Sequence, residues 1–370
     1  MKRKHGGAKR RGFSLTEMLV VVLIIGVLVG VVGSLMGGFV TNFEMTDDQS
    51  IARRRAQDVF NILQTPILNA GLGIPPNLFS YYFGPLASDI DGAPIKNWSG
   101  PIQVISHDES GTGFKATKGN RGEALLVVYS IYSGVKNVSD ADIIAFSGPT
   151  SGDAGPLEFS LSGNAPLGGG DGIQFANAGT NLVHSYITFP GISMHPELVT
   201  GKGSGGGNDT LQVYGKRPYV TDADEDVLPR NVIRPYHDMF LVRAAMAYVD
   251  DDGTFCMYDI NDDGDIFNRG GSLSIASKAD ADGELVYRVE GIKAVRFLPD
   301  IDTENRVTGV NVHVLAEGDN AVTGRRTDTQ AVQDLRGRWP GIAKKDWDDD
   351  MYYEDFEMRW RTRNIEAPIL

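Results

Sequence analysis

The sequence predicts an α+β fold in which a long N-terminal helix, membrane-spanning in its first half, is followed by a β-rich globular body with long loops. Three observations lead to this prediction. No charged residue occurs between Met18 and Phe43, apolar residues recur at helical spacing from 47 to 70, and the remainder contains short β-branched and aromatic runs separated by turn signals.

These observations divide the chain into four parts. We expect a basic leader at 1–12, a transmembrane and assembly helix at 13–43, and an amphipathic helix packing on the body at 44–73. A β-rich exported domain is expected at 74–370. The uncharged run is longer than the ~20 residues that a bilayer-spanning helix needs.

Charge is distributed unevenly along the chain. The charged side chains of the first eleven residues are all positive: Lys2, Arg3, Lys4, Lys9, Arg10 and Arg11. This cluster should keep the N-terminus in the cytoplasm, with the body exported. Without these six charges the remainder carries −19, against −13 for the whole chain. Because so acidic a body repels phosphate backbones, general nucleic-acid binding is not expected.

Two ordinary interpretations of the N-terminus explain it less well. A secretory signal peptide has an apolar stretch of about 7–15 residues closed by a small-residue cleavage site, and this run is longer and has no such site. A plain membrane anchor fits the length but leaves Glu17 unexplained. A carboxylate costs on the order of 2–3 kcal/mol at the bilayer centre and less near the interface. Glu17 is therefore a candidate functional residue, the alternative being a snorkelling interface residue.

The order of basic leader, Gly12, Phe13, Ser-Leu-Thr, Glu17 and unbroken apolar run resembles the class III signal of type IV prepilins and type II secretion pseudopilins. The resemblance implies that a prepilin peptidase cuts between Gly12 and Phe13 and methylates the new amine. It also implies that Glu17 pairs with the N-terminal amine of a neighbouring subunit. Truncating one partner of such a pair would leave the other uncompensated.

The same resemblance implies a minor pilin or pseudopilin with a pilin-like body, a structural subunit and not an enzyme. Its partners would be the prepilin peptidase/methyltransferase, other pilins or pseudopilins, the inner-membrane assembly platform and membrane lipid. Residues 56–71 resemble the corresponding helix of PilW-like minor pilins and J-type type II secretion pseudopilins more weakly, and residues 352–364 resemble the terminal strand of the large minor pilins. The large body favours a low-copy subunit. The alternatives are a signal-anchored envelope enzyme or binding protein and a calcium-dependent tip adhesin.

Four glycines in the apolar run are candidates for helix packing. Gly26 and Gly30, like Gly33 and Gly37, form small-xxx-small pairs, which let helices approach closely in a membrane. Glycine is also frequent in transmembrane helices generally, so both interpretations stay open.

The second helical stretch is amphipathic. Its apolar face comprises Ile51, Ala52, Ala56, Val59, Phe60, Leu63 and Ile67, with Arg53, Arg54 and Arg55 largely off it. Thr46 and Gln49 have the spacing of a capping box, which would mark a break, whereas the stretch otherwise continues the first helix. Gly71 and Gly73 are expected to terminate it.

The body is predicted to be built of strands. The expected strands are 103–106, 124–133, 143–146, 157–161, 182–189, 211–214, 239–249, 254–260, 285–289, 294–298, 309–315 and 356–362. Glycine-rich stretches at 162–172 and 200–207 are expected to be loops, and 317–350 a long surface loop. The alternating arginines 359, 361 and 363 indicate one solvent face of an edge strand, or a subunit contact.

One motif in the body suggests a metal. Asp259, Asn261, Asp263 and Asp265 match the first half of an EF-hand-type calcium loop, but Gly270 stands where a bidentate glutamate belongs. A missing ligand would have to come from elsewhere, such as Asp250, Asp251 or Asp252. The motif therefore predicts either a structural calcium site or an acidic β-turn, and no other cofactor is indicated. The lone cysteine, Cys256, is expected to be a buried structural thiol.

Overall fold

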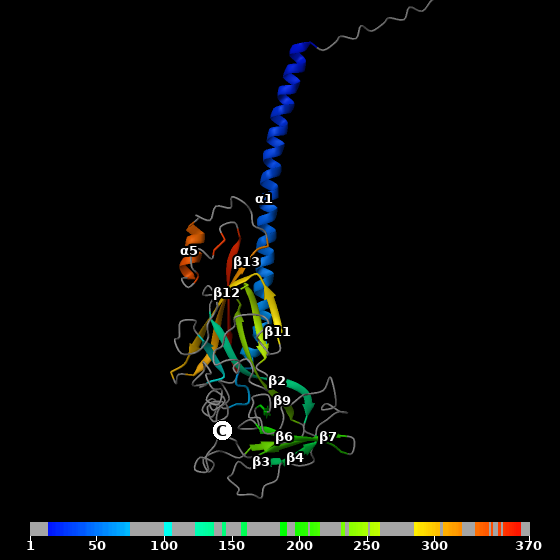
Figure 1. Cartoon of the computed structure of the whole chain (residues 1–370), viewed down its shortest axis with the longest axis vertical. Coiled ribbons are helices and arrows are strands. Elements are labelled where there is room, and N and C mark those ends of the chain that lie inside the picture. Colours follow the sequence, from blue (N-terminus) through cyan, green and yellow to red (C-terminus); the bar gives the residue numbers. More distant parts are fainter. Residues whose placement is uncertain are drawn as a thin grey trace, which may run out of the picture.

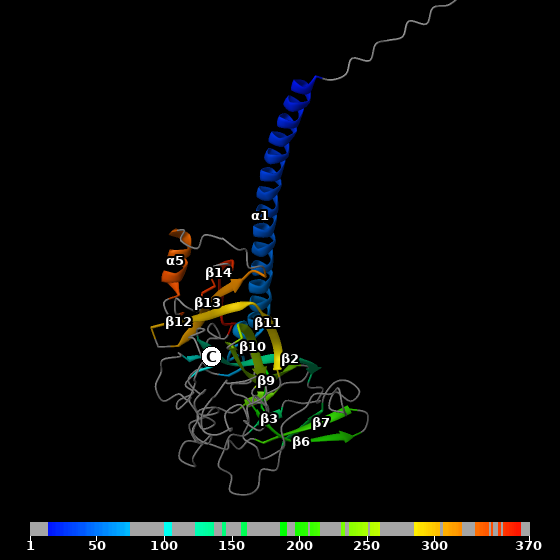
Figure 2. The same cartoon turned by 45° about the horizontal axis from the view of Figure 1, so that its top comes forward.

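A computed structural model confirms the α+β class (Figure 1). It describes residues 14–74, 100–105, 123–136, 143–145, 157–160, 186–190, 197–205, 208–214, 231–233, 237–250, 252–259, 285–303, 306–319, 330–339, 342, 347–348 and 351–363. Helix α1 (Leu15–Leu68) stands out of the β-rich body as a long rod, and its second half lies along the body (Figures 1 and 2).

The helix α1 begins and ends where the local sequence dictates. Ser14 caps the N-terminus, and Asn69 caps the C-terminus before Gly71 and Gly73, whose positive φ angles of 65° and 78° favour glycine. The helix does not break at Thr46: its hydroxyl donates to the Asn42 carbonyl at 2.9 Å instead of capping a new helix. The capping-box interpretation was therefore wrong. The Thr46 hydroxyl bonds to a carbonyl one turn earlier in the same helix, so it does not cap the N-terminus of a second helix.

The described part of the body contains three antiparallel sheets. The largest has the order β1-β2-β9-β5-β6-β7-β4, with β10 pairing both β9 and β11; the others are β12-β13-β14 and β3-β8. The strand bounds are β1 Ile102–Ile105, β2 Ala124–Lys136, β3 Ile143–Ala145, β4 Leu157–Ser160, β5 Tyr186–Thr188, β6 Glu197–Gly205, β7 Asn208–Tyr214, β8 Asn231–Ile233, β9 Asp238–Val249, β10 Thr254–Asp259, β11 Leu285–Glu290, β12 Ile292–Ile301, β13 Val307–Glu317 and β14 Tyr353–Arg361.

One core joins helix α1 to the two larger sheets. On β13, Val310, Val312 and Val314 are fully buried and belong to the same cluster as Phe60 and Leu63 of α1. Phe60 meets Trp360 of β14 edge to face, with ring centroids 5.8 Å apart. The helix is therefore fixed to the body by apolar packing on both sheets.

Only one of the two glycine-rich stretches that were expected to be loops can be compared with the structure. Residues 200–205 belong to β6, which pairs with β7 across the two connecting residues Gly206 and Gly207, so the loop prediction was wrong there. A Gly-Gly pair between strands is a hairpin signal, which the high glycine content obscured. The other stretch, 162–172, lies outside the described residues.

Part of the polar stretch 317–350 is helical. Helix α5 (Gln330–Arg338) covers the outer face of the three-stranded sheet (Figure 1), where Leu335, Trp339, Ile342 and Trp347 are buried around Leu315. The sequence signal was the i, i+4 spacing of Leu335 and Trp339 within a charged segment.

Strand β14 lies at an edge of its sheet, as the alternating arginines indicated. Arg359 and Arg361 are exposed, whereas Trp360 and Thr362 between and beside them are buried. Arg359 Nε donates to the Asp300 carboxylate at 2.7 Å.

Glu123 bridges the two larger sheets. Its N–H donates to the Val295 carbonyl at 3.1 Å, and its carboxylate accepts from the Phe297 N–H at 2.7 Å. Burial raises the pKa of the Glu123 carboxyl above its usual value, against the Phe297 N–H and Arg296, which lower it. This contact joins the edge of β12 to the larger sheet.

Substitutions of Glu123 should separate the hydrogen bond from the charge. A carboxyl whose folded pKa is raised binds its proton more tightly in the folded state, so the contribution of Glu123 to wild-type stability should fall as pH rises from below 4.5 through the folded pKa. Glu123→Gln keeps an acceptor for Phe297 and should show less of this fall. Glu123→Ala leaves that N–H without its partner and should cost about 1–3 kcal/mol. Urea unfolding across pH tests both; an E123Q profile parallel to wild type would contradict the assignment.

Candidate assembly site

The first half of α1 is apolar and makes no buried contact with the described part of the body. Its large apolar side chains from Leu15 to Met45 are exposed, and the first buried residue of the helix is Asp48. Among the described residues, α1 is the one helix long and apolar enough to cross a membrane. A surface of this kind is stable in lipid or against other apolar helices, but not in water.

Glu17 lies at the N-terminal end of this surface. Its carboxylate accepts from the Ser14 N–H at 2.9 Å, while the Ser14 hydroxyl accepts from the Glu17 N–H at 3.2 Å. The two residues form a capping box, a feature that the sequence analysis missed although Ser-x-x-Glu is its signature. Gly12 and Phe13, the candidate processing residues, lie outside the described residues.

The four glycines of the apolar run leave open space. A Cβ placed on Gly26, Gly30, Gly33 or Gly37 would meet no atom within 4 Å. At 100° per residue these positions lie within about 60° of one another, on one face of the helix. Since nothing in the described part of this chain fills that face, close packing there would require another helix.

The second half of α1 is locked to the body by a polar contact as well as by the core. Arg55 donates to the Glu317 carbonyl at 2.6 Å and forms an ion pair with Asp319. It packs so closely against Gly291 that a Cβ there would overlap the guanidinium group. Arg55 is thus turned towards the body, contrary to its expected place off the packing face. Helical spacing did not reveal the contact of Arg55 with the body, because the long arginine side chain extends from its own face of the helix to the packed face.

Asp48 marks the level at which α1 meets the body. It is fully buried although its neighbour Asp47 is exposed. A Cβ on Gly318 would lie 2.8 Å from the Asp48 side chain, so the loop after β13 approaches the helix closely there. No sequence pattern signalled this contact.

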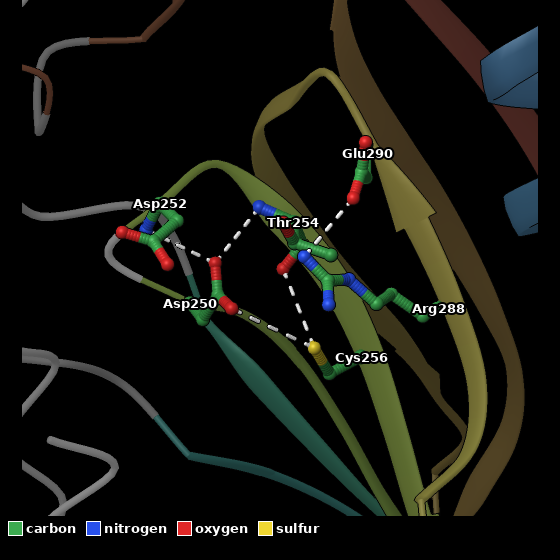
Figure 3. Close-up of polar contacts among 6 residues, drawn as sticks. All are labelled: Asp250, Asp252, Thr254, Cys256, Arg288 and Glu290. Atoms are coloured by element: carbon green, nitrogen blue, oxygen red, sulfur yellow. Dashed lines mark hydrogen bonds and ion pairs between the residues drawn. The ribbon is translucent and has the colours of Figure 1, made fainter. Parts of the chain in front are cut away.

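The calcium motif is described only at its first residue. Asp259 is the last residue of β10, and Asn261, Asp263 and Asp265 lie outside the described residues. Asp250 and Asp252 lie at the opposite end of β10, about 17 Å away along the strand (Figure 3). These two carboxylates therefore cannot complete a site at Asp259, which corrects that part of the prediction.

The turn before β10 is instead held by its own hydrogen bonds. The Asp250 carboxylate accepts from the N–H groups of Asp252 at 3.0 Å and Thr254 at 2.8 Å (Figure 3). Cys256 is buried, as expected, with its sulfur 3.8 Å from Asp250 Oδ2. On the neighbouring β11, Arg288 pairs with Glu290 at 3.0 Å. Within the described part of the chain, no group of three or more His, Cys, Asp or Glu side chains could hold a metal.

Comparison with known proteins bears on the N-terminus alone. Residues 7–33 match the family model of the prokaryotic N-terminal methylation motif. Neither a curated protein nor a solved structure matches the chain significantly. The match supports a type IV prepilin-like signal segment, membrane anchoring through the apolar helix, and a pilin-like or pseudopilin role in general.

Proposed function

We propose that the chain is a minor pilin or pseudopilin, made as a membrane precursor and assembled into a type IV pilus or a type II secretion-like filament. The main support for this proposal is the exposed apolar half of α1. It carries a single acid, Glu17, at its start, and this acid lies inside the methylation motif. An anchor needs only the apolar length, whereas a filament subunit also needs a surface on which other helices pack.

In this proposal the precursor is cut between Gly12 and Phe13, and the Phe13 amine is methylated. The α1 helices of neighbouring subunits then pack together, with Gly26, Gly30, Gly33 and Gly37 allowing close approach. The amine of one subunit neutralises Glu17 of the next, which removes the cost of an unpaired charge among apolar helices. Assembly requires the prepilin peptidase, other pilins and an inner-membrane platform.

The attachment of α1 to the body fits this role. Phe60 and Leu63 pack into the core that joins both sheets, and Arg55 ties the helix to the loop after β13. Force applied to the exposed half of α1 is therefore transmitted to both large sheets at once. A body carried into or out of a filament needs such a connection.

A separation of filaments from cells tests the proposal. Filaments sheared from the native cells should contain this chain alongside the other pilins, at low abundance if it is a minor subunit. Finding all of it in the membrane under conditions in which filaments form would favour an anchored envelope protein instead.

A further inference from the structure

The face of α1 that points away from the body carries two opposite charges. The buried residues of the helix's second half, among them Ala52, Ala56 and Leu63, share one face. At 100° per residue, Asp47 and Arg54 lie within about 20° of each other and nearly opposite that face. Both side chains are exposed. Asp47 and Arg54 are called the outer pair below.

The outer pair is not used within the chain as far as the structure describes it. Neither side chain makes a hydrogen bond or ion pair with a described residue, whereas the side chain of the adjacent Arg55 binds Glu317 and Asp319. The two are seven residues apart, which places them about 10.5 Å apart along the axis, too far for a direct ion pair within the helix.

We propose that the outer pair joins two copies of this chain, with Arg54 of one copy meeting Asp47 of another. The proposal rests on the function proposed above and adds to it that at least two copies of this chain are neighbours in the filament, even where the chain is a low-abundance subunit. Copies inserted in one membrane have parallel α1 helices, so the contact requires an axial displacement of two helical turns, about 10.5 Å. The outer pair would thus set the stagger of neighbouring subunits just outside the membrane, where Glu17 cannot act.

A second copy fits this surface better than lipid. Arg54 lies eleven residues beyond Phe43, the end of the apolar run, hence about 16 Å past it and outside the headgroup layer. Asp47 lies close to the headgroups, where anionic lipid would repel it. A parallel α1 offers both an acid and a base at the required spacing.

Charge reversal tests the contact. We expect Arg54→Glu to lower the filament-incorporated fraction roughly five-fold, because the introduced carboxylate would face Asp47. Asp47→Arg should do the same, and the double variant should recover to within about two-fold of wild type. Arg53→Glu is the matched control: it makes the same charge change at an exposed arginine 100° round the helix and should have little effect. Thermal melting of each variant in detergent verifies folding.

Crosslinking gives a second readout that does not depend on assembly yield. Asp47→Cys and Arg54→Cys in one chain are too far apart for an internal disulfide, and Cys256 is buried. Oxidised filaments should therefore yield covalent multimers from the double-cysteine chain and none from either single-cysteine chain.

The outcomes are separable. Three results would overturn the outer pair while leaving the filament role intact. They are a double-reversal variant as defective as the single ones, an Arg53→Glu defect equal to that of Arg54→Glu, and oxidised filaments without the crosslink. A wild-type protein that is never cut at Phe13 or never enters filaments would instead reject the proposed function on which the pair rests.

Discussion

Replacing Glu17 with alanine is expected to lower filament incorporation by at least about 100-fold while leaving membrane insertion intact. The apolar run of α1 is unchanged by the substitution, so the helix still spans the bilayer. In a filament, however, the neighbouring amine would lose its partner among apolar helices, a loss of about 3–5 kcal/mol for a buried pair. Immunoblots of sheared filaments and of washed membranes measure the two effects separately.

The capping box provides matched controls. Glu17→Gln keeps the hydrogen-bonding group that a capping box uses at this position but removes the charge. Ser14→Ala weakens the cap, at a cost of about 0.5–2 kcal/mol, but keeps the charge. We expect Glu17→Gln to lose filament incorporation, as Glu17→Ala does. Ser14→Ala, in contrast, should still assemble into filaments. Normal assembly of Glu17→Gln would mean that Glu17 only caps the helix.

Phe60→Ala is expected to give the largest loss of folding stability, about 3–5 kcal/mol. Phe60 is 6% exposed and contacts Trp360 edge to face, in the core shared by α1 and both large sheets. Its removal leaves a cavity at the point where the helix is attached to the body. Urea unfolding of the detergent-solubilised chain, followed by tryptophan fluorescence, measures the loss because Trp360 is buried.

Asn61→Ala is the control for this substitution. Asn61 is the next residue along α1 and is exposed on the face turned away from the core. Its substitution should change stability by no more than about 0.5 kcal/mol. Equal effects at 60 and 61 would show that α1 does not pack on the body through the face described here.

The sequence predicted those parts of the fold that follow from short-range patterns. Helical spacing placed Phe60 and Leu63 on the packed face of α1, and alternation placed Val310, Val312 and Val314 in the core. The strands of the body were located by their β-branched and aromatic runs, except β6 and β8. Such patterns work because burial repeats with the period of the element.

Contacts that depend on tertiary structure were not predictable. Arg55 reaches residues 317 and 319, and Glu123 reaches Phe297, over separations that no local pattern encodes. Helix α5 was hidden by its charged surroundings, since its few apolar residues are buried on a sheet face whose position is set by the fold. At the N-terminus, by contrast, Glu17 and the apolar run could be identified directly, because membrane insertion imposes constraints on consecutive residues.

The central claim is that this chain follows the prepilin route, and the mass of its mature N-terminus tests that most directly. The protein purified from its native membrane should begin at Phe13 and carry one added methyl group. A protein that begins at Met1, or that is cut beyond the apolar run, would contradict the account and indicate an anchored or secreted envelope protein.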